Sequence, residues 1–161
     1  MATITSIVQA KILEPYQLPD WEVRLPIRQL WISFEFWDWV EATRSLHDQH
    51  RKIGGRTLCE HMEQLLCDFR CAPRIGAGDI KRMMPTPDGI WKLHPKGMRL
   101  YGWAPQKDAM VIIAGALESE TKIDKDLNNK RMAQVLEFIS ANELSDSVER
   151  GEIYVVFPPH Q

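Results

Sequence analysis

The sequence predicts an α+β protein in which helices pack against an antiparallel β-sheet. The first observation is the order of its periodic segments: a strand, two helices, three strands, a helix and a last strand. The second is the shortness of the turns between the three middle strands, which favours an antiparallel meander. We expect the helices to cover one face of the sheet and the other face to stay open. The chain has 161 residues, 44% hydrophobic and 26% charged, which is the composition of one globular domain.

The N-terminal segment predicts an extended arm followed by a strand and a helix. Three prolines interrupt any long helix in the arm: Pro15, Pro19 and Pro26. We therefore expect one short strand in residues 1–28. Residues 30–36 are rich in aromatic and branched side chains and predict a strand, whereas residues 37–51 change to helical spacing.

A second helix follows the pair Gly54-Gly55, which ends the first one. Thr57 is its predicted N-cap, and Glu60 stands three residues later, where it completes a capping box. The apolar residues that follow recur at helical spacing and form one face: Leu58, Met62, Leu65, Leu66 and Phe69. Two antiparallel helices joined by a short glycine turn form a helical hairpin.

The three middle strands are predicted at residues 90–94, 98–103 and 110–117, with turns between them. A helix is predicted at residues 124–140 and a last strand at residues 153–157. Alternation and hydrophobicity assign six strand side chains to the core: Trp91, Leu93, Met98, Leu100, Val111 and Ile113.

The cysteines and histidines do not form a recognisable metal site. Cys59, Cys67 and Cys71 are an odd number, and reduced thiols in a cytoplasm are the simplest interpretation. His47 and His50 are three residues apart, but no further ligand completes a set. The chain shows neither a membrane-spanning apolar run nor a secretory signal. We expect a soluble cytoplasmic protein that needs no cofactor or metal and does not bind a membrane.

Charge is distributed unevenly along the chain, although the formal net charge is only −2. Residues 51–107 contain eleven Lys/Arg and five Asp/Glu, a balance of +6. Residues 108–161 contain five and ten, and residues 1–50 contain four and seven, which gives −5 and −3. The middle segment can therefore form a basic face suited to phosphate, or its charges can meet carboxylates elsewhere in the fold.

The middle of the chain resembles the RelE/ParE toxin superfamily, and within it the phage-associated, HigB-like branch. The resemblance lies in residues 89–103 (Gly-Ile-Trp-Lys-Leu-His-Pro-Lys-Gly-Met-Arg-Leu-Tyr-Gly-Trp), residues 110–117 (Met-Val-Ile-Ile-Ala-Gly-Ala-Leu) and Thr121-Lys122. Lys-Arg-Met-Ala at residues 130–133 is similar to the pattern in the family's last helix. Together with the upstream strand and the helical hairpin, the resemblance covers residues 29–142.

The resemblance implies a RelE-like fold, with an antiparallel sheet, an N-terminal helical hairpin and a C-terminal helix. Residues 1–28 would then be an N-terminal arm, and residues 143–161 a C-terminal extension with one strand. It also implies a toxin of a toxin-antitoxin pair, often a ribosome-dependent mRNA endonuclease (an mRNA interferase), that is neutralised by a cognate antitoxin. Its partners would be that antitoxin, or another protein, and the ribosome with its mRNA.

Metal-independent RNA cleavage needs a base at the 2′-oxygen, positive charge at the phosphate and an acid at the leaving oxygen. Alternation places Lys92 and His94 on one face of their strand, and Arg99 and Tyr101 on one face of the next. These four are the predicted catalytic residues: Arg99 would hold the phosphate, His94 or Tyr101 would transfer protons, and Lys92 would stabilise developing charge. Further basic residues are predicted to bind RNA: Lys96, Lys122, Arg70, Arg74, Lys81 and Arg82.

Two departures from the family pattern support a second hypothesis. His94 stands where the family has Arg, and Glu118-Ser119-Glu120 stands where it brings positive charge. Two carboxylates beside a scissile phosphate would repel it. The alternative is a catalytically silent member that acts as a protein-binding inhibitor of a phage or mobile element. Four tryptophans would then form core or partner surface: Trp21, Trp31, Trp37 and Trp39.

Overall fold

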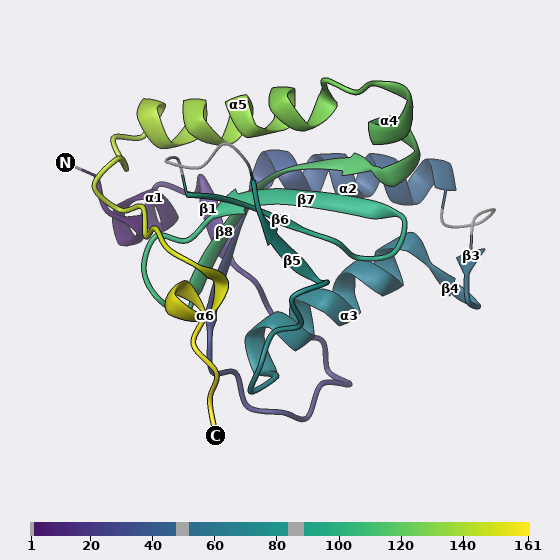
Figure 1. The fold of residues 1–161 in the computed structure, drawn as a ribbon, viewed down its shortest axis with the longest axis horizontal. Helices are drawn as coiled ribbons and strands as arrows, with labels where there is room; N and C mark the ends of the chain where they lie inside the picture. The colour runs from purple at the N-terminus through teal and green to yellow at the C-terminus, as the bar shows by residue number, and fades with distance from the viewer. Residues whose placement is uncertain (1, 48–51, 84–88) are drawn as a thin grey trace.

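The computed structural model describes residues 2–47, 52–83 and 89–161, which form one six-stranded sheet flanked by helices (Figure 1). The strand order is β1-β2-β8-β7-β6-β5. The strands are β1 (Leu13–Pro15), β2 (Gln29–Ser33), β5 (Ile80–Arg82), β6 (Ile90–Leu93), β7 (Met98–Trp103) and β8 (Ala109–Leu117). A separate small hairpin consists of β3 (Lys52–Ile53) and β4 (Arg56–Thr57).

Helices cover both faces of the sheet. They are α1 (Ile4–Gln9), α2 (Phe34–His47), α3 (Leu58–Cys71), α4 (Glu118–Ile123), α5 (Leu127–Ala141) and α6 (Ile153–Val156). Apolar residues of α2 and α3 share one core with the sheet, and those of α1 and α5 share a second core with its other face. Figure 1 shows α5 and α3 on opposite sides of the strands. The expectation that helices cover only one face is therefore wrong.

The α+β class is confirmed, and so is the antiparallel meander of β6, β7 and β8. The prediction of a wholly antiparallel sheet is wrong, because β2 pairs with β8 in parallel. Short turns force β6, β7 and β8 to alternate in direction. The long helical connection after β2 imposes no such constraint, so this strand can run either way.

Two local predictions need correction, one strand was missed, and one prediction is confirmed. Residues 1–28 contain α1, whose N-cap Thr3 forms a capping box with Ser6, in addition to the short strand β1. The last predicted strand is the short helix α6 instead. The short edge strand β5 was not predicted.

At α3 the predicted N-cap is confirmed, because Thr57 and Glu60 form their reciprocal hydrogen bonds at 3.1 and 3.2 Å. The predicted first helix corresponds to α2, and residues 48–51 of that prediction lie outside the described part of the chain.

Residues 153–157 are apolar enough for a strand, but their burial does not alternate. Val156 and Phe157 are adjacent and both fully buried. The Phe157 ring packs edge-on against Phe69 of α3 and Trp91 of β6, with centroids 5.4 and 5.2 Å apart. A strand would turn one of two neighbouring side chains away from the core, so a helical turn buries this pair better.

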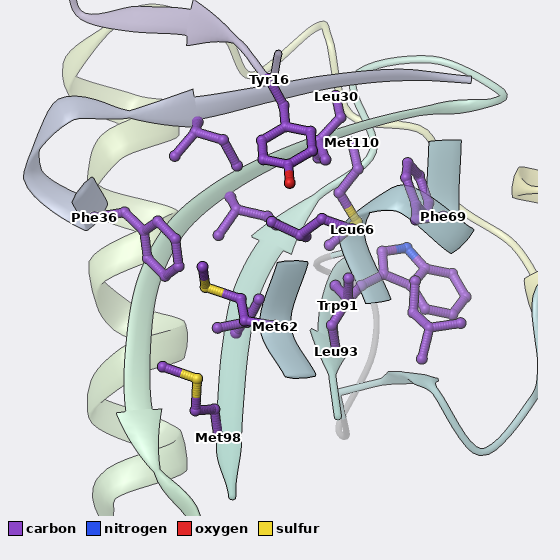
Figure 2. Packing of buried hydrophobic residues seen from close by; sticks show 14 of the residues in the cluster. Tyr16, Leu30, Phe36, Met62, Leu66, Phe69, Trp91, Leu93, Met98 and Met110 are labelled. Atoms are coloured by element: carbon purple, nitrogen blue, oxygen red, sulfur yellow. The ribbon is translucent and has the colours of Figure 1, made fainter. Parts of the chain in front are cut away.

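The first core confirms the predicted inward side chains of the meander. Trp91, Leu93, Met98 and Leu100 are all buried on the face that α3 covers, as Figure 2 shows for the first three beside Met62, Leu66 and Phe69. Val111 and Ile113 are also buried, but they belong to the second core.

A buried arginine connects four segments of the chain. Arg28 is 2% exposed, and its guanidinium forms an ion pair with Asp108 at 3.2 Å. It also donates to backbone carbonyls at the end of α3, Phe69 and Ala72 among them at 3.0 and 2.6 Å, and to Pro158 at 3.4 Å. The start of β2, the end of α3, the β7–β8 turn and the C-terminal segment therefore meet at one side chain.

Among the helices described, none is both long and apolar enough to cross a bilayer.

Candidate functional site

Four basic side chains lie together on the sheet face opposite α3, at the end formed by β5, β6 and β7. In the strand register, Lys81 of β5 lies opposite Lys92 of β6, and Lys92 lies opposite Tyr101 of β7. These three residues therefore form one row across the strands. Leu93 pairs with Leu100, which places the next residues, His94 and Arg99, side by side in the following row. We call Lys81, Lys92, His94 and Arg99 the cationic face. The strand register thus brings together all four predicted catalytic residues, with Lys81 beside them.

Lys92 lies near the middle of the cationic face and is partly buried. Burial lowers the pKa of its ammonium group, and the positive charges of Arg99 and Lys81 lower it further. Lys92 is therefore closer to losing its proton at neutral pH than an ordinary surface lysine. An amine in this state can serve as a proton donor.

His94 carries no charge at neutral pH. Burial lowers the pKa of its imidazole to about 4, with further lowering by Arg99, Lys92 and Lys81, while Glu118 acts in the opposite direction. Its Nε2 atom is buried and has no hydrogen-bond partner among the described residues. A buried unpaired polar atom is unfavourable, and such atoms often mark functional sites. The neutral ring is in the state that accepts a proton.

Arg99 is held by backbone on one side and by a carboxylate on the other. Its Nη1 donates to the carbonyl oxygens of Met98 and Pro95, at 2.6 and 3.4 Å. Its Nη2 lies 3.2 Å from Glu118 Oε1, and the same oxygen lies 3.4 Å from Lys122 Nζ. Burial acts to raise the pKa of the Glu118 carboxyl, but these two cations, together with a backbone hydrogen bond from Gly97, outweigh it and the pKa is lowered. Glu118 is therefore an ionised neighbour of the cationic face.

Tyr101 shares this sheet face but is not accessible from it. The residue is fully buried, and its hydroxyl donates to Asn128 Oδ1 of α5. Burial raises the pKa of the phenol to about 12. The prediction of an open face therefore does not hold here, because α5 packs over β7 and β8 at this position. Strand alternation alone cannot indicate whether a helix covers the far side of a sheet.

The residues predicted to bind RNA divide into two groups. Lys96 and Lys122 are exposed near the cationic face, and Lys81 belongs to it. The other three, Arg70, Arg74 and Arg82, contact the N-terminal arm or the C-terminal segment.

Each of these three arginines has a structural partner. Arg70 donates to the carbonyls of Tyr16 and Arg28, at 2.9 and 3.1 Å. Arg74 stacks on the Tyr154 ring at 4.3 Å, and Arg82 pairs with Glu152 at 3.2 Å. These three side chains therefore do not form one basic edge with Lys81.

Glu118 is the nearby group whose position sequence reasoning missed. The sequence interpretation treated it only as a source of repulsion, whereas the structure pairs it with Arg99. A signal was present: Arg99 faces Ala116 across the strands, so the residue two positions later projects to the same side.

The tryptophans and the metal-ligand candidates give simpler results. Trp31, Trp37 and Trp39 pack against the two cores, and only Trp21 of the predicted Trp-rich surface is more than half exposed, at 54%.

Within the described ranges, no three His, Cys, Asp or Glu side chains are grouped as metal ligands. The three cysteines are buried, and none of them forms a disulfide. His50 of the pair His47 and His50 lies outside the described residues.

Comparisons with protein-family models, with curated proteins and with solved structures give no match. The resemblance to RelE/ParE toxins therefore rests on the residues quoted above, and the functional argument rests on the geometry of the cationic face.

Proposed function

We propose that this chain binds single-stranded RNA through the cationic face and cleaves it without a metal, as the resemblance to RelE-like toxins implies. The observation that supports this most is the strand register, which groups Lys81, Lys92, His94 and Arg99 on one side of the sheet. Three cations around a neutral imidazole form a site that favours a phosphate and provides a proton acceptor.

The reaction assigns one role to each side chain. Neutral His94 accepts the proton of the 2′-hydroxyl at Nδ1, because Nε2 is buried, and the 2′-oxygen attacks the neighbouring phosphorus. Arg99 and Lys81 stabilise the negative charge on the non-bridging oxygens. The bond from phosphorus to the 5′-oxygen breaks, Lys92 gives this leaving oxygen a proton, and a 2′,3′-cyclic phosphate remains. Tyr101, with its hydroxyl held by Asn128, positions β7 and transfers no proton.

The proposed partners follow from this assignment. Messenger RNA would reach the cationic face, on the ribosome if the chain acts as RelE-like toxins do. An antitoxin would neutralise the protein by covering the same face, and the exposed Lys96 and Lys122 would extend the area available to RNA.

Replacement of the phosphate-binding arginine tests the proposal. Arg99→Ala should lower the rate of RNA cleavage about a hundred- to a thousandfold, because one preformed electrostatic contact to the phosphate is lost. It should also remove toxicity when the protein is expressed in cells. The control is Lys107→Ala, since Lys107 is an exposed cation in the β7–β8 turn, away from the cationic face. A wild-type protein that is harmless and inert on ribosome-bound RNA would rule out the enzyme.

The pH dependence of kcat/KM provides a second test, because it reports the protonation of the free enzyme. As pH rises through about 4, His94 loses its proton and activity should appear. At alkaline pH, activity should fall as Lys92 loses its proton, with a midpoint below 10.5 because its pKa is lowered. Lys92→Arg should lower kcat/KM at every pH and remove this alkaline fall, since a guanidinium keeps its proton and cannot give it to the leaving oxygen. An unchanged alkaline limb in this variant would remove Lys92 from the mechanism.

A second candidate function, protein binding, is favoured by a row of exposed apolar side chains in the N-terminal arm. Val23 and Leu25 are 90% and 84% exposed, and Trp21 and Ile27 are 54% and 37% exposed. Between them, Arg24 forms ion pairs with Glu22 of the arm and with Asp68 of α3, both at 2.8 Å. We call Trp21, Val23, Leu25 and Ile27 the apolar stripe. An ordered apolar surface of this kind is typical of partner binding.

The partner that suits the apolar stripe carries apolar and basic side chains. Carboxylates outnumber arginines among the charged residues of the neighbouring hollows. A groove of about 510 Å³ contains Glu14, Asp20 and Glu63 and one arginine, Arg44, in its lining. Trp21 lines an adjoining hollow together with Glu60, Glu63 and Arg56. Charge complementarity therefore favours a Lys- or Arg-containing segment.

A twelve-residue peptide of alternating leucine and lysine serves as the probe for this surface. Titration calorimetry should detect binding that weakens at least tenfold in the double variant Val23→Ser/Leu25→Ser, because the apolar contacts are lost. Ile123→Ser is the control, since Ile123 is 86% exposed on α4. Equal binding of the peptide to all three proteins, or of a leucine–glutamate peptide to the wild type, would contradict this function.

A further inference from the structure

The Glu118 carboxylate occupies the position beside Arg99 where a bound phosphate oxygen would lie. Its Oε1 atom is 3.2 Å from Arg99 Nη2 and 3.4 Å from Lys122 Nζ. One oxygen between two cationic nitrogens is the arrangement that a phosphate oxygen adopts in an anion site. The protein thus places one of its own anions in contact with the cationic face.

The backbone fixes the place of this carboxylate. Glu118 begins α4 directly after β8, and its N–H donates to Gly97 O, in the β6–β7 turn, at 2.9 Å. The side chain is 32% exposed. Glu118 is therefore anchored to Gly97, and its carboxylate is partly exposed, so a competing anion in solution can reach it.

Arg99 has limited capacity for a second anion. Its Nη1 is already engaged by the carbonyls of Met98 and Pro95, so Nη2 is the terminal nitrogen that faces an anion. Because Glu118 Oε1 lies against that nitrogen, a phosphate oxygen that takes the same place must displace the carboxylate.

We propose that Glu118 is an internal competitor that sets the affinity of the cationic face and selects for ligands with several phosphates. This inference rests on the proposed function. A single phosphate that displaces Glu118 gains only its contact with Arg99, whereas an RNA strand also gains contacts with Lys81 and Lys92. Displacing Glu118 costs both ligands the same free energy, which the additional contacts of a strand offset and the one contact of a free phosphate does not.

The test measures binding without cleavage. The probe is a single-stranded oligodeoxynucleotide, which lacks the 2′-hydroxyl and cannot react, and inorganic phosphate is titrated in parallel. Glu118→Gln should lower the Kd for the oligonucleotide on the order of tenfold, because Arg99 loses its charged partner. It should also lower the Kd for inorganic phosphate. Glu137→Gln is the matched control, because it removes the same charge from an exposed position on α5.

A double-variant cycle shows whether Glu118 acts through Arg99. In an Arg99→Ala background, Glu118→Gln should lower the Kd for the oligonucleotide by much less than tenfold. If the wild type binds the oligonucleotide and Glu118→Gln binds it equally or more weakly, the competitor role is wrong and the RNA-binding proposal stands. If neither folded protein binds the oligonucleotide, the proposed function fails, and the inference fails with it.

Discussion

The buried guanidinium of Arg28 is the interaction on which the arrangement of the elements depends. A charge this deep in a protein is tolerated only when its donors are paired. Here Asp108 provides the counter-charge and the carbonyls at the end of α3 accept the remaining bonds. Burial still lowers the pKa of Arg28, the opposite effect to that of Asp108. Asp108 also bonds His160 at 2.9 Å, so the C-terminal segment joins the same network.

This network fixes the end of α3 and the β7–β8 turn with respect to β2. The three-strand meander is thereby held with its apolar face on α3, and its opposite face is left to α5 and to solvent. Over β7 and β8 that opposite face is covered by α5, and Tyr101 is buried there. Near the β6–β7 turn, the same face of β5 and β6 carries Lys81, Lys92 and His94 in place of apolar side chains. Among the described residues, the cationic face therefore lies where neither apolar core covers this side of the sheet.

The features that local chemistry determines could be predicted from the sequence. Short turns determine the meander, a Thr–Glu pair determines the start of α3, and alternation determines which side of β6 and β7 carries Lys92 and Arg99. The features that depend on distant segments could not be predicted. The parallel pairing of β2 with β8, the cover of α5 over Tyr101 and the burial of Arg28 each join residues far apart in the chain. The position of Glu118 lies between these cases, because it follows from the strand register once the meander is known.

The salt dependence of nucleic-acid binding tests most directly whether the cationic face contacts phosphate. For single strands, the slope of log K against log salt is about −0.7 for each phosphate contacted. The triple variant Lys81→Ala/Lys92→Ala/Arg99→Ala should therefore bind a single-stranded oligodeoxynucleotide with a slope about two units shallower than that of the wild type. A wild type and a triple variant with equal affinity and equal slope would show that phosphate binds elsewhere, and would contradict this account of the protein.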